Sequence, residues 1–215
     1  MNIIPTINVK TKEEAERAIQ TLQELPITWV QFDIGDGVFS ASETWDGPQE
    51  AIELIEKYMP HVFCEAHIMK RSPEESARGW IDAGARRIII HYETVDEKTM
   101  KSIISYAKEK NVRMMIALLP NTPISVLEKY EEVNEVQILA VHPGPSGQSF
   151  IFEMVEKIKL LKRTFPFVYI EIDGGINRDT ALLVAKAHAD AVAVNAYLSK
   201  SREIKKDFLL LKEIV

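Results

Sequence analysis

Eight short apolar runs alternate with segments of helical periodicity along the whole chain of 215 residues. The runs have the length and the β-branched content of buried strands, and proline, glycine or asparagine separates many of them from the helical segments. The predicted strands are residues 2–8, 27–34, 62–69, 87–91, 112–119, 136–141, 168–173 and 189–195. The predicted helices are residues 11–25, 48–58, 73–83, 96–110, a short one ending near 130, then 150–164, 177–187 and 201–212.

This alternation predicts a parallel sheet, because a helix between two strands returns the chain to the same end of the sheet. Eight such units with short connections predict a closed (β/α)8 barrel, in one domain over residues 1–215. An open, doubly wound sheet is the competing fold. That fold usually carries a glycine-rich phosphate turn after its first strand. The first predicted strand ends in Thr6-Ile7-Asn8-Val9 instead, which favours the barrel.

Charge and cysteine content argue against several classes of protein. The formal net charge is −6 and the pI is about 5.5, whereas a general nucleic-acid binder carries a basic patch. The one cysteine, Cys64, lies in an apolar run and has no partner for an internal disulfide. We therefore expect a buried thiol in a reducing compartment. We find no signal peptide and no apolar stretch near the roughly 18 residues that cross a membrane, so we expect a cytoplasmic protein.

Polar residues two positions apart lie near the ends of three predicted strands. The pairs are Gln31 and Asp33, Glu65 and His67, and Glu171 and Asp173. Side chains two apart on a strand point to the same face. Active sites of such barrels lie at the carboxyl ends of the strands. We therefore expect the three pairs to meet at one mouth, as a pocket of carboxylates and one imidazole.

Two aspartates that face one cavity would repel each other unless a cation lay between them. Asp33, His67 and Asp173 offer oxygen and nitrogen ligands that suit zinc, manganese, iron or cobalt, and Gln31 can add its amide oxygen. The alternative is that His67 is a hydrogen-bonded core histidine and that both aspartates cap loops. The shared position at strand ends favours a metal site.

Two glycine-rich turns indicate a second binding element. Gly174-Gly175 precedes a predicted helix, whose N-terminal N–H groups and dipole favour an anion. The loop of residues 144–147, Gly-Pro-Ser-Gly, can also turn N–H donors toward a ligand. A phosphate group on a small sugar is the ligand that these turns predict.

These motifs resemble those of the ribulose-phosphate 3-epimerases, over nearly the whole chain. The resemblance is carried by residues 32–37, FDIGDG, and by residues 171–175, EIDGG. It implies a TIM barrel of the ribulose-phosphate-binding type. It also implies that Asp33 and Asp173 are the two acid/base catalysts and metal ligands, and that His67 binds the metal and touches the substrate.

The resemblance also implies the substrate and the residues that bind it. The substrate is a ketose phosphate, D-ribulose 5-phosphate by default, whose C3 is inverted through an enediolate that a divalent metal stabilises. We also expect a homo-oligomer, whose subunit number the sequence does not fix. The implied substrate-binding residues are Thr6, His67, Met69, Gly144, Pro145, Ser146, Gly147, Gly174, Gly175, Val194 and Asn195.

The chain departs from the family pattern at the expected site. Gln31 stands where the family has a metal-binding histidine, which predicts weaker metal binding or none. Val194-Asn195 stands where a Gly-Ser pair binds phosphate, and Gly35 and His142 replace a methionine and an asparagine. Two alternatives stay open: a 3-epimerase of a different ketose phosphate, and a barrel that binds a sugar phosphate without turnover. A related decarboxylase is disfavoured, because the third strand lacks an Asp-x-Lys-x-x-Asp run.

Overall fold

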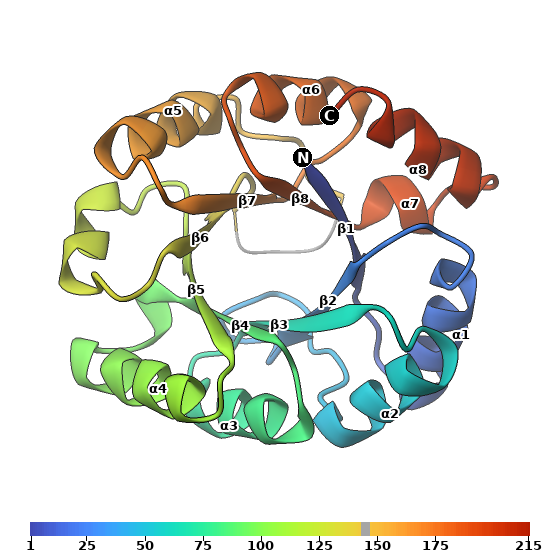
Figure 1. Cartoon of the computed structure of the whole chain (residues 1–215), viewed down its shortest axis with the longest axis horizontal. Coiled ribbons are helices and arrows are strands. Elements are labelled where there is room, and N and C mark those ends of the chain that lie inside the picture. Colours follow the sequence, from blue (N-terminus) through green and yellow to red (C-terminus); the bar gives the residue numbers. More distant parts are fainter. Residues whose placement is uncertain (143–146) are drawn as a thin grey trace.

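The computed structural model of the chain describes residues 1–142 and 147–215, and it confirms the predicted barrel. In these residues, eight parallel strands pair in sequence order and β8 closes onto β1 (Figure 1). The strands are β1 Asn2–Ile7, β2 Trp29–Gly35, β3 Phe63–Met69, β4 Arg87–His91, β5 Arg113–Leu118, β6 Glu135–Leu139, β7 Tyr169–Asp173 and β8 Ala191–Val194.

Helices surround the barrel wall on its outer side (Figure 1). They are α1 Lys12–Leu22, α2 Pro48–Tyr58, α3 Glu74–Ala83, α4 Glu97–Glu109, α5 Met154–Thr164, α6 Arg178–Lys186, α7 Ala196–Ser199 and α8 Ile204–Lys212, with the 3-10 helices η1 Tyr92–Thr94 and η2 Ile124–Lys129. Two predictions are corrected here. The helix expected from residue 150 begins at Met154, and the short helix expected to end near residue 130 is the 3-10 helix η2.

Local sequence signals set where several helices begin and end. Thr11 caps α1, because its Oγ1 accepts a hydrogen bond from the backbone N–H of Glu14 at 3.2 Å. Asn177 and Thr180 form a capping box at the start of α6. Gly84 ends α3 in the left-handed conformation, with φ of 109°. The loops at both ends of the barrel are therefore anchored by short-range contacts.

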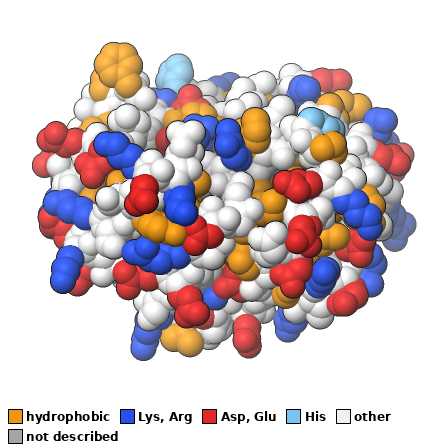
Figure 2. All heavy atoms as spheres, turned by 60° about the horizontal axis from the view of Figure 1, so that its bottom comes forward, with side chains coloured by type: hydrophobic (Ala, Val, Ile, Leu, Met, Phe, Trp, Pro, Cys, Tyr) orange, Lys and Arg blue, Asp and Glu red, His pale blue; other side chains and the backbone are white. Residues whose placement is uncertain are grey.

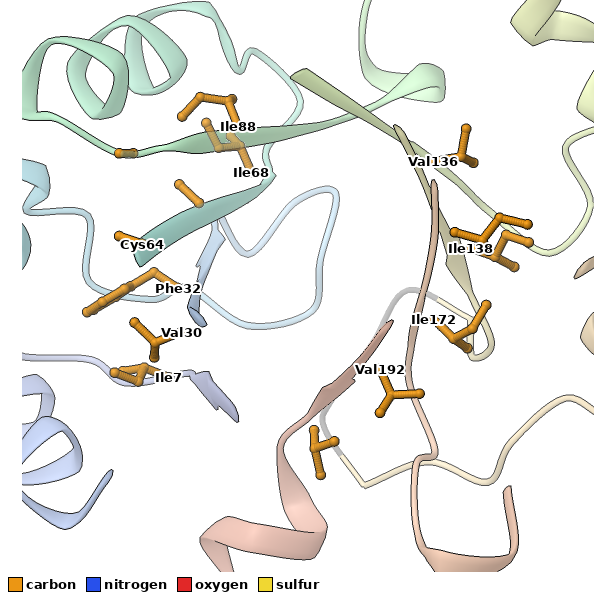
Figure 3. Close-up of a cluster of buried hydrophobic side chains, with 14 of the residues drawn as sticks. Ile7, Val30, Phe32, Cys64, Ile68, Ile88, Val136, Ile138, Ile172 and Val192 are labelled. Carbon is orange, nitrogen blue, oxygen red and sulfur yellow. The ribbon is translucent and has the colours of Figure 1, made fainter. Parts of the chain in front are cut away.

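The main apolar core lies between the barrel wall and the helices. Its side chains leave the strands at alternate positions and point away from the barrel axis, as Figure 3 shows for Phe32, Ile68, Val136 and Ile172. Cys64 is buried in this core, as expected. The residues between these positions point inward, so every second residue of each strand is free to build the interior and the mouth.

A charged cluster lies in the barrel interior, although such interiors are usually apolar. Arg87 of β4 donates to Glu135 of β6 at 2.9 Å and to Glu171 of β7 at 2.7 Å, and it also pairs with Glu65 of β3. Arg87, Glu65 and Glu171 are buried. Burial and the neighbouring carboxylate of Glu171 raise the pKa of Glu65. Glu65 and Glu171 therefore lie below the mouth at which we expected them.

The outer surface is mixed in charge. On the face in Figure 2, lysine and arginine side chains are interspersed with aspartate and glutamate, which agrees with the modest net charge of −6. Of the helices in the described parts of the chain, none has both the length and the apolar character needed to cross a membrane.

Candidate functional site

A cavity of about 310 Å³ opens where the strands end, and carboxylates of two strands line it. Asp33 lies near the end of β2, Asp173 is the last residue of β7, and His67 of β3 lies between them. Because parallel strands end at one rim, residues distant in the sequence converge there. The lining also includes five of the residues expected to bind substrate, namely Met69, Gly147, Gly174, Gly175 and Asn195.

Asp33, His67 and Asp173 form the centre of the cavity. Their ligand atoms all lie within 4.8 Å of one another. His67 Nδ1 is 3.2 Å from Asp173 Oδ2 and 3.5 Å from Asp33 Oδ1. Burial by itself would lower the pKa of His67, but the hydrogen bonds with Asp173 and Asp33 raise it to about 10. The three residues that the strand ends predicted therefore meet, and an imidazolium there offsets part of the carboxylate charge.

Gln31 lies directly beneath these three side chains and turns its amide nitrogen toward them. Nε2 donates to Asp33 Oδ1 at 2.7 Å and to Asp173 Oδ2 at 3.0 Å. It also lies 3.4 Å from His67 Nδ1. The amide oxygen, which we expected to face a metal, instead accepts a hydrogen bond from Gln137 Nε2 at 3.0 Å. Gln31 thus meets the aspartates as a donor.

Sequence reasoning did not assign Asn8 or Gln137 to the site. Asn8, which follows β1, lines the cavity and donates to Asp33 Oδ2 at 3.4 Å. Gln137 lies on β6 between Val136 and Ile138 and is fully buried. The signal for Gln137 was present in the sequence, since a polar residue between two apolar strand residues points to the barrel interior.

His91 contacts His67 at the Nε2 atom of its ring, while Nδ1 faces the aspartates. The two Nε2 atoms are 2.9 Å apart, and the rings are stacked with centroids 5.0 Å apart. Burial lowers the pKa of His91 to about 4, so its neutral ring accepts the proton that the Nε2 of His67 donates. The Nδ1 of His91 then faces the carboxylate of Glu93 at 3.5 Å. This arrangement fixes the plane of the His67 ring.

The segment after β2 folds back over the end of that strand. Thr44 Oγ1 accepts from the N–H of Gly35 at 2.8 Å and donates to the carbonyl of Asp33 at 2.7 Å. A Cβ at position 35 would collide with the carbonyl of Ser42 and the hydroxyl of Ser40. Glycine at this position is therefore tied to the path of the loop, which leaves no room for the methionine of the resembled family.

The turn after β7 brings backbone groups to the cavity. Gly174 and Gly175 have φ values of 104° and 67°, in the left-handed region. A Cβ on Gly175 would lie 2.6 Å from the backbone nitrogen of Phe150. The side-chain oxygen of Asn177 already accepts from the N–H groups of Asp179 and of the residue after it, at 2.9 and 3.1 Å. These first N–H groups of α6 are therefore engaged by the cap.

The other residues expected to bind substrate either do not line the cavity or fall outside the described residues. Thr6 is buried one layer below the mouth, and its Oγ1 has no hydrogen-bond partner in the described part of the chain. Val194 packs in the outer apolar core, while the next residue, Asn195, lines the cavity. Gly144, Pro145 and Ser146 fall outside the described residues.

Comparison with known proteins shows the family to which the chain belongs. A family model described as "Ribulose-phosphate 3 epimerase family" matches residues 2–198. The chain belongs to the ribulose-phosphate 3-epimerase family. The ribulose-phosphate 3-epimerase of Chlamydia trachomatis serovar D is 30% identical over 206 residues, which cover 93% of this chain and 84% of that protein. The epimerase of Chlamydia pneumoniae is 32% identical over 200 residues, which cover 89% and 85%.

Solved structures give the same fold at lower identity. The 3-hexulose-6-phosphate synthase from Salmonella typhimurium has a TM-score of 0.74 at 16% identity and covers 100% of this epimerase-family chain and 98% of its own. The 3-keto-L-gulonate-6-phosphate decarboxylase from Vibrio cholerae has a TM-score of 0.73 at 12% identity, with 99% and 95% covered. At these identities the likeness extends to the TIM barrel alone.

Proposed function

We propose that this member of the ribulose-phosphate 3-epimerase family inverts C3 of a ketose phosphate, with D-ribulose 5-phosphate as the default substrate. The supporting observation is that Asp33 and Asp173 both lie within 3.0 Å of one nitrogen atom, in a cavity of about 310 Å³. Two carboxylates so close together, on different strands, can approach one carbon atom from two directions. Inversion at C3 requires two such groups.

The side chains of the site have separate parts in this reaction. One aspartate would remove the C3 proton, which is acidic because it lies next to the C2 carbonyl, and the other would return a proton to the opposite face. Gln31 and His67 hold both carboxylates by hydrogen bonds. His91 in turn holds His67. Fixed donors of this kind keep the two carboxylates oriented for proton transfer.

Asp33, His67 and Asp173 are the residues that would hold a divalent ion of zinc, manganese, iron or cobalt. Their ligand atoms lie within 4.8 Å of one another and are of the types that such ions take, but an ion would have to displace the Gln31 nitrogen that lies among them. A bound ion would polarise the sugar oxygens and stabilise the enediolate. Gln31 does not fit as a fourth ligand in this conformation, because its N–H groups face the centre.

We further propose that the phosphate lies near Gly175 and Asn195 of the lining. A structure of KGPDC from Streptococcus mutans with a TM-score of 0.76 is described as a complex with D-R5P, which supports a sugar phosphate as the ligand class. A rice relative, 29% identical, is named a cytoplasmic isoform, and we propose the same location here. A role in the pentose phosphate pathway and a homo-oligomeric state complete the proposal.

The test is solvent deuterium exchange at C3 of ribulose 5-phosphate, followed by NMR with each metal added in turn. We expect exchange together with formation of xylulose 5-phosphate. Asp33→Asn and Asp173→Asn should each lower the rate by about 10²–10⁴-fold, the usual contribution of a positioned acid or base. Asp82→Asn, on the exposed side of α3, is the matched control.

A negative result would also be informative. A folded protein that exchanges C3 of no ketose phosphate contradicts the epimerase. Binding of ketose phosphates without exchange would support the second candidate, a barrel that binds its ligand without turnover. The amide of Gln31, in place of the imidazole of the family, is the observation that favours that candidate.

A further inference from the structure

The orientation of the Gln31 amide follows from a chain of hydrogen bonds that begins at a buried cation. Arg87 donates to Glu171 Oε2 at 2.7 Å. Gln137 Nε2 donates to the other oxygen, Glu171 Oε1, at 2.9 Å. A carboxylate accepts hydrogen bonds and an arginine only donates them, so Gln137 must turn its nitrogen to Glu171. The second N–H of Gln137 then needs an acceptor, which is Gln31 Oε1 at 3.0 Å.

This series of hydrogen bonds leaves only one orientation for the side-chain amide of Gln31. Its N–H groups meet two carboxylate oxygens, of Asp33 and Asp173. If the amide were turned over, its oxygen would lie against those oxygens at 2.7 and 3.0 Å, and its nitrogen would face the nitrogen of Gln137. Both contacts would be repulsive. The oxygen of Gln31 is therefore unable to face the centre unless Gln137 moves as well.

The amide nitrogen also occupies the middle of the ligand set. It lies within 3.4 Å of one atom each of Asp33, His67 and Asp173. These atoms belong to the side chains whose ligand atoms cluster within 4.8 Å. An ion bound by all three would have to displace this nitrogen and break two hydrogen bonds to charged groups.

We propose that Gln31 takes the place of a cation in this site and that Gln137 is the residue that positions it. The amide group holds Asp33 and Asp173 together by donating to both, so divalent ions bind the unmodified protein weakly. The statement about metal binding stands independently of the reaction. The corollary that the two aspartates exchange a substrate proton without an ion rests on the proposed function.

Gln31→Glu is the sharpest test, because the new side chain has nearly the same shape and keeps an acceptor for Gln137. It replaces the inward N–H groups by a carboxylate oxygen, so three carboxylates face one another at the centre of the site and repel one another unless a cation binds. We expect Mn²⁺ and Zn²⁺ to bind this variant at least about 100-fold more tightly than the unmodified protein, since changes outside the ligand shell alone alter metal affinity by about 10–100-fold. Isothermal titration calorimetry measures both affinities.

Gln137→Met tests the positioning role. Methionine has a similar length and no amide, so Gln31 becomes free to turn its oxygen inward. We expect metal affinity to rise about tenfold, within the range for an outer-shell change, although position 137 touches none of the three ligands. A merely structural residue would not raise metal affinity when replaced. Gln49→Glu, on the exposed first turn of α2, controls for metal bound elsewhere.

Thermal unfolding and NMR give readouts that need no activity. With a chelator present, Gln31→Glu should unfold below the unmodified protein, and Mn²⁺ should reverse the loss. In the unmodified protein, the side-chain amide signals of Gln31, assigned by their disappearance in Gln31→Met, should keep their chemical shifts when Zn²⁺ is added. This NMR measurement tests whether Zn²⁺ displaces the Gln31 amide even if Gln31→Glu does not fold.

Two results would overturn the inference. One is equal metal affinity of the unmodified protein and Gln31→Glu, and the other is a shift of the Gln31 amide signals on addition of Zn²⁺. Failure of the epimerase proposal looks different, because C3 exchange is then absent while the order of metal affinities is as expected. Exchange that a chelator abolishes in the unmodified protein would retain the epimerase and refute only the corollary that the aspartates exchange a proton without an ion.

Discussion

Replacing Arg87 by methionine should destabilise the barrel strongly, because the cation at the centre of a buried cluster is lost. Arg87 is 1% exposed, and its partners Glu65 and Glu171 are 0% exposed. Removing one partner of a buried ion pair typically costs about 3–5 kcal/mol, since the other charge is left in the interior uncompensated. For a chain of 215 residues, this corresponds to a fall in Tm of about 6–20 °C.

The loss should depend on pH in a defined direction. Without Arg87, burial raises the pKa of both glutamates further above the unfolded value of 4.5. A group whose pKa is raised on folding stabilises the folded state below its unfolded pKa, and that contribution disappears as the pH rises through the folded pKa. Arg87→Met should therefore lose more free energy of unfolding at pH 8 than at pH 5.

Urea unfolding followed by circular dichroism at both pH values is the assay. Arg113→Met is the control, because Arg113 pairs with Glu135 at 2.5 Å while 47% of its side chain is exposed. Because the arginine of this pair reaches water and Glu135 keeps Arg87 as a second partner, its loss should cost about 1 kcal/mol or less. Equal losses for the two variants, or a loss at Arg87 that is the same at pH 5 and pH 8, would refute the reasoning.

Two further substitutions test the loop over the site and a buried lysine. Gly35→Ala should cost about 1–3 kcal/mol through overpacking and slow C3 exchange, because the new methyl group collides with the carbonyl of Ser42; unchanged urea unfolding would contradict the close approach. Lys157→Met should cost about 1–3 kcal/mol, because Nζ donates to three backbone carbonyls, at 2.7, 3.2 and 2.7 Å. Lys159→Met, which loses one exposed pair, should change the unfolding free energy by much less, and an equal change would remove the special role of Lys157.

Most of the fold was predictable because strands and helices leave different periods in the sequence. The bounds of α2, Pro48–Tyr58, and of β4, Arg87–His91, match the prediction to the residue. The convergence of Asp33, His67 and Asp173 was predictable for a topological reason, since parallel strands end at the same rim. The predicted bounds of an element agree less well with the structure where contacts between distant segments determine where it begins. Residues just before Met154 were expected to be helical, but Phe150 lies against the turn after β7 instead.

The sequence predicted which face of the strand the polar residues occupy, but not how far below the mouth of the barrel they lie. Alternation places Glu171 on the same face as Asp173, but two residues of strand separate them by roughly 6.6 Å. That distance moves the glutamate from the mouth to Arg87 in the interior. The orientation of Gln31 is set by Gln137, 106 residues away. A pattern read within one strand carries no information on such a partner.

The hydrogen-bonded chain from Arg87 to Gln31 has a consequence for how the protein can evolve. Substitutions at positions 31, 137 and 171 should be epistatic, because each residue fixes the donor or acceptor that the next one meets. A neutral histidine at position 31 that bound a metal through one ring nitrogen would keep a proton on the other, so it would offer Gln137 Nε2 no acceptor in place of the Gln31 oxygen. Reversal to the family's histidine by a single mutation would therefore carry a penalty until position 137 supplied an acceptor. The present glutamine is entrenched by a neighbour that touches neither aspartate.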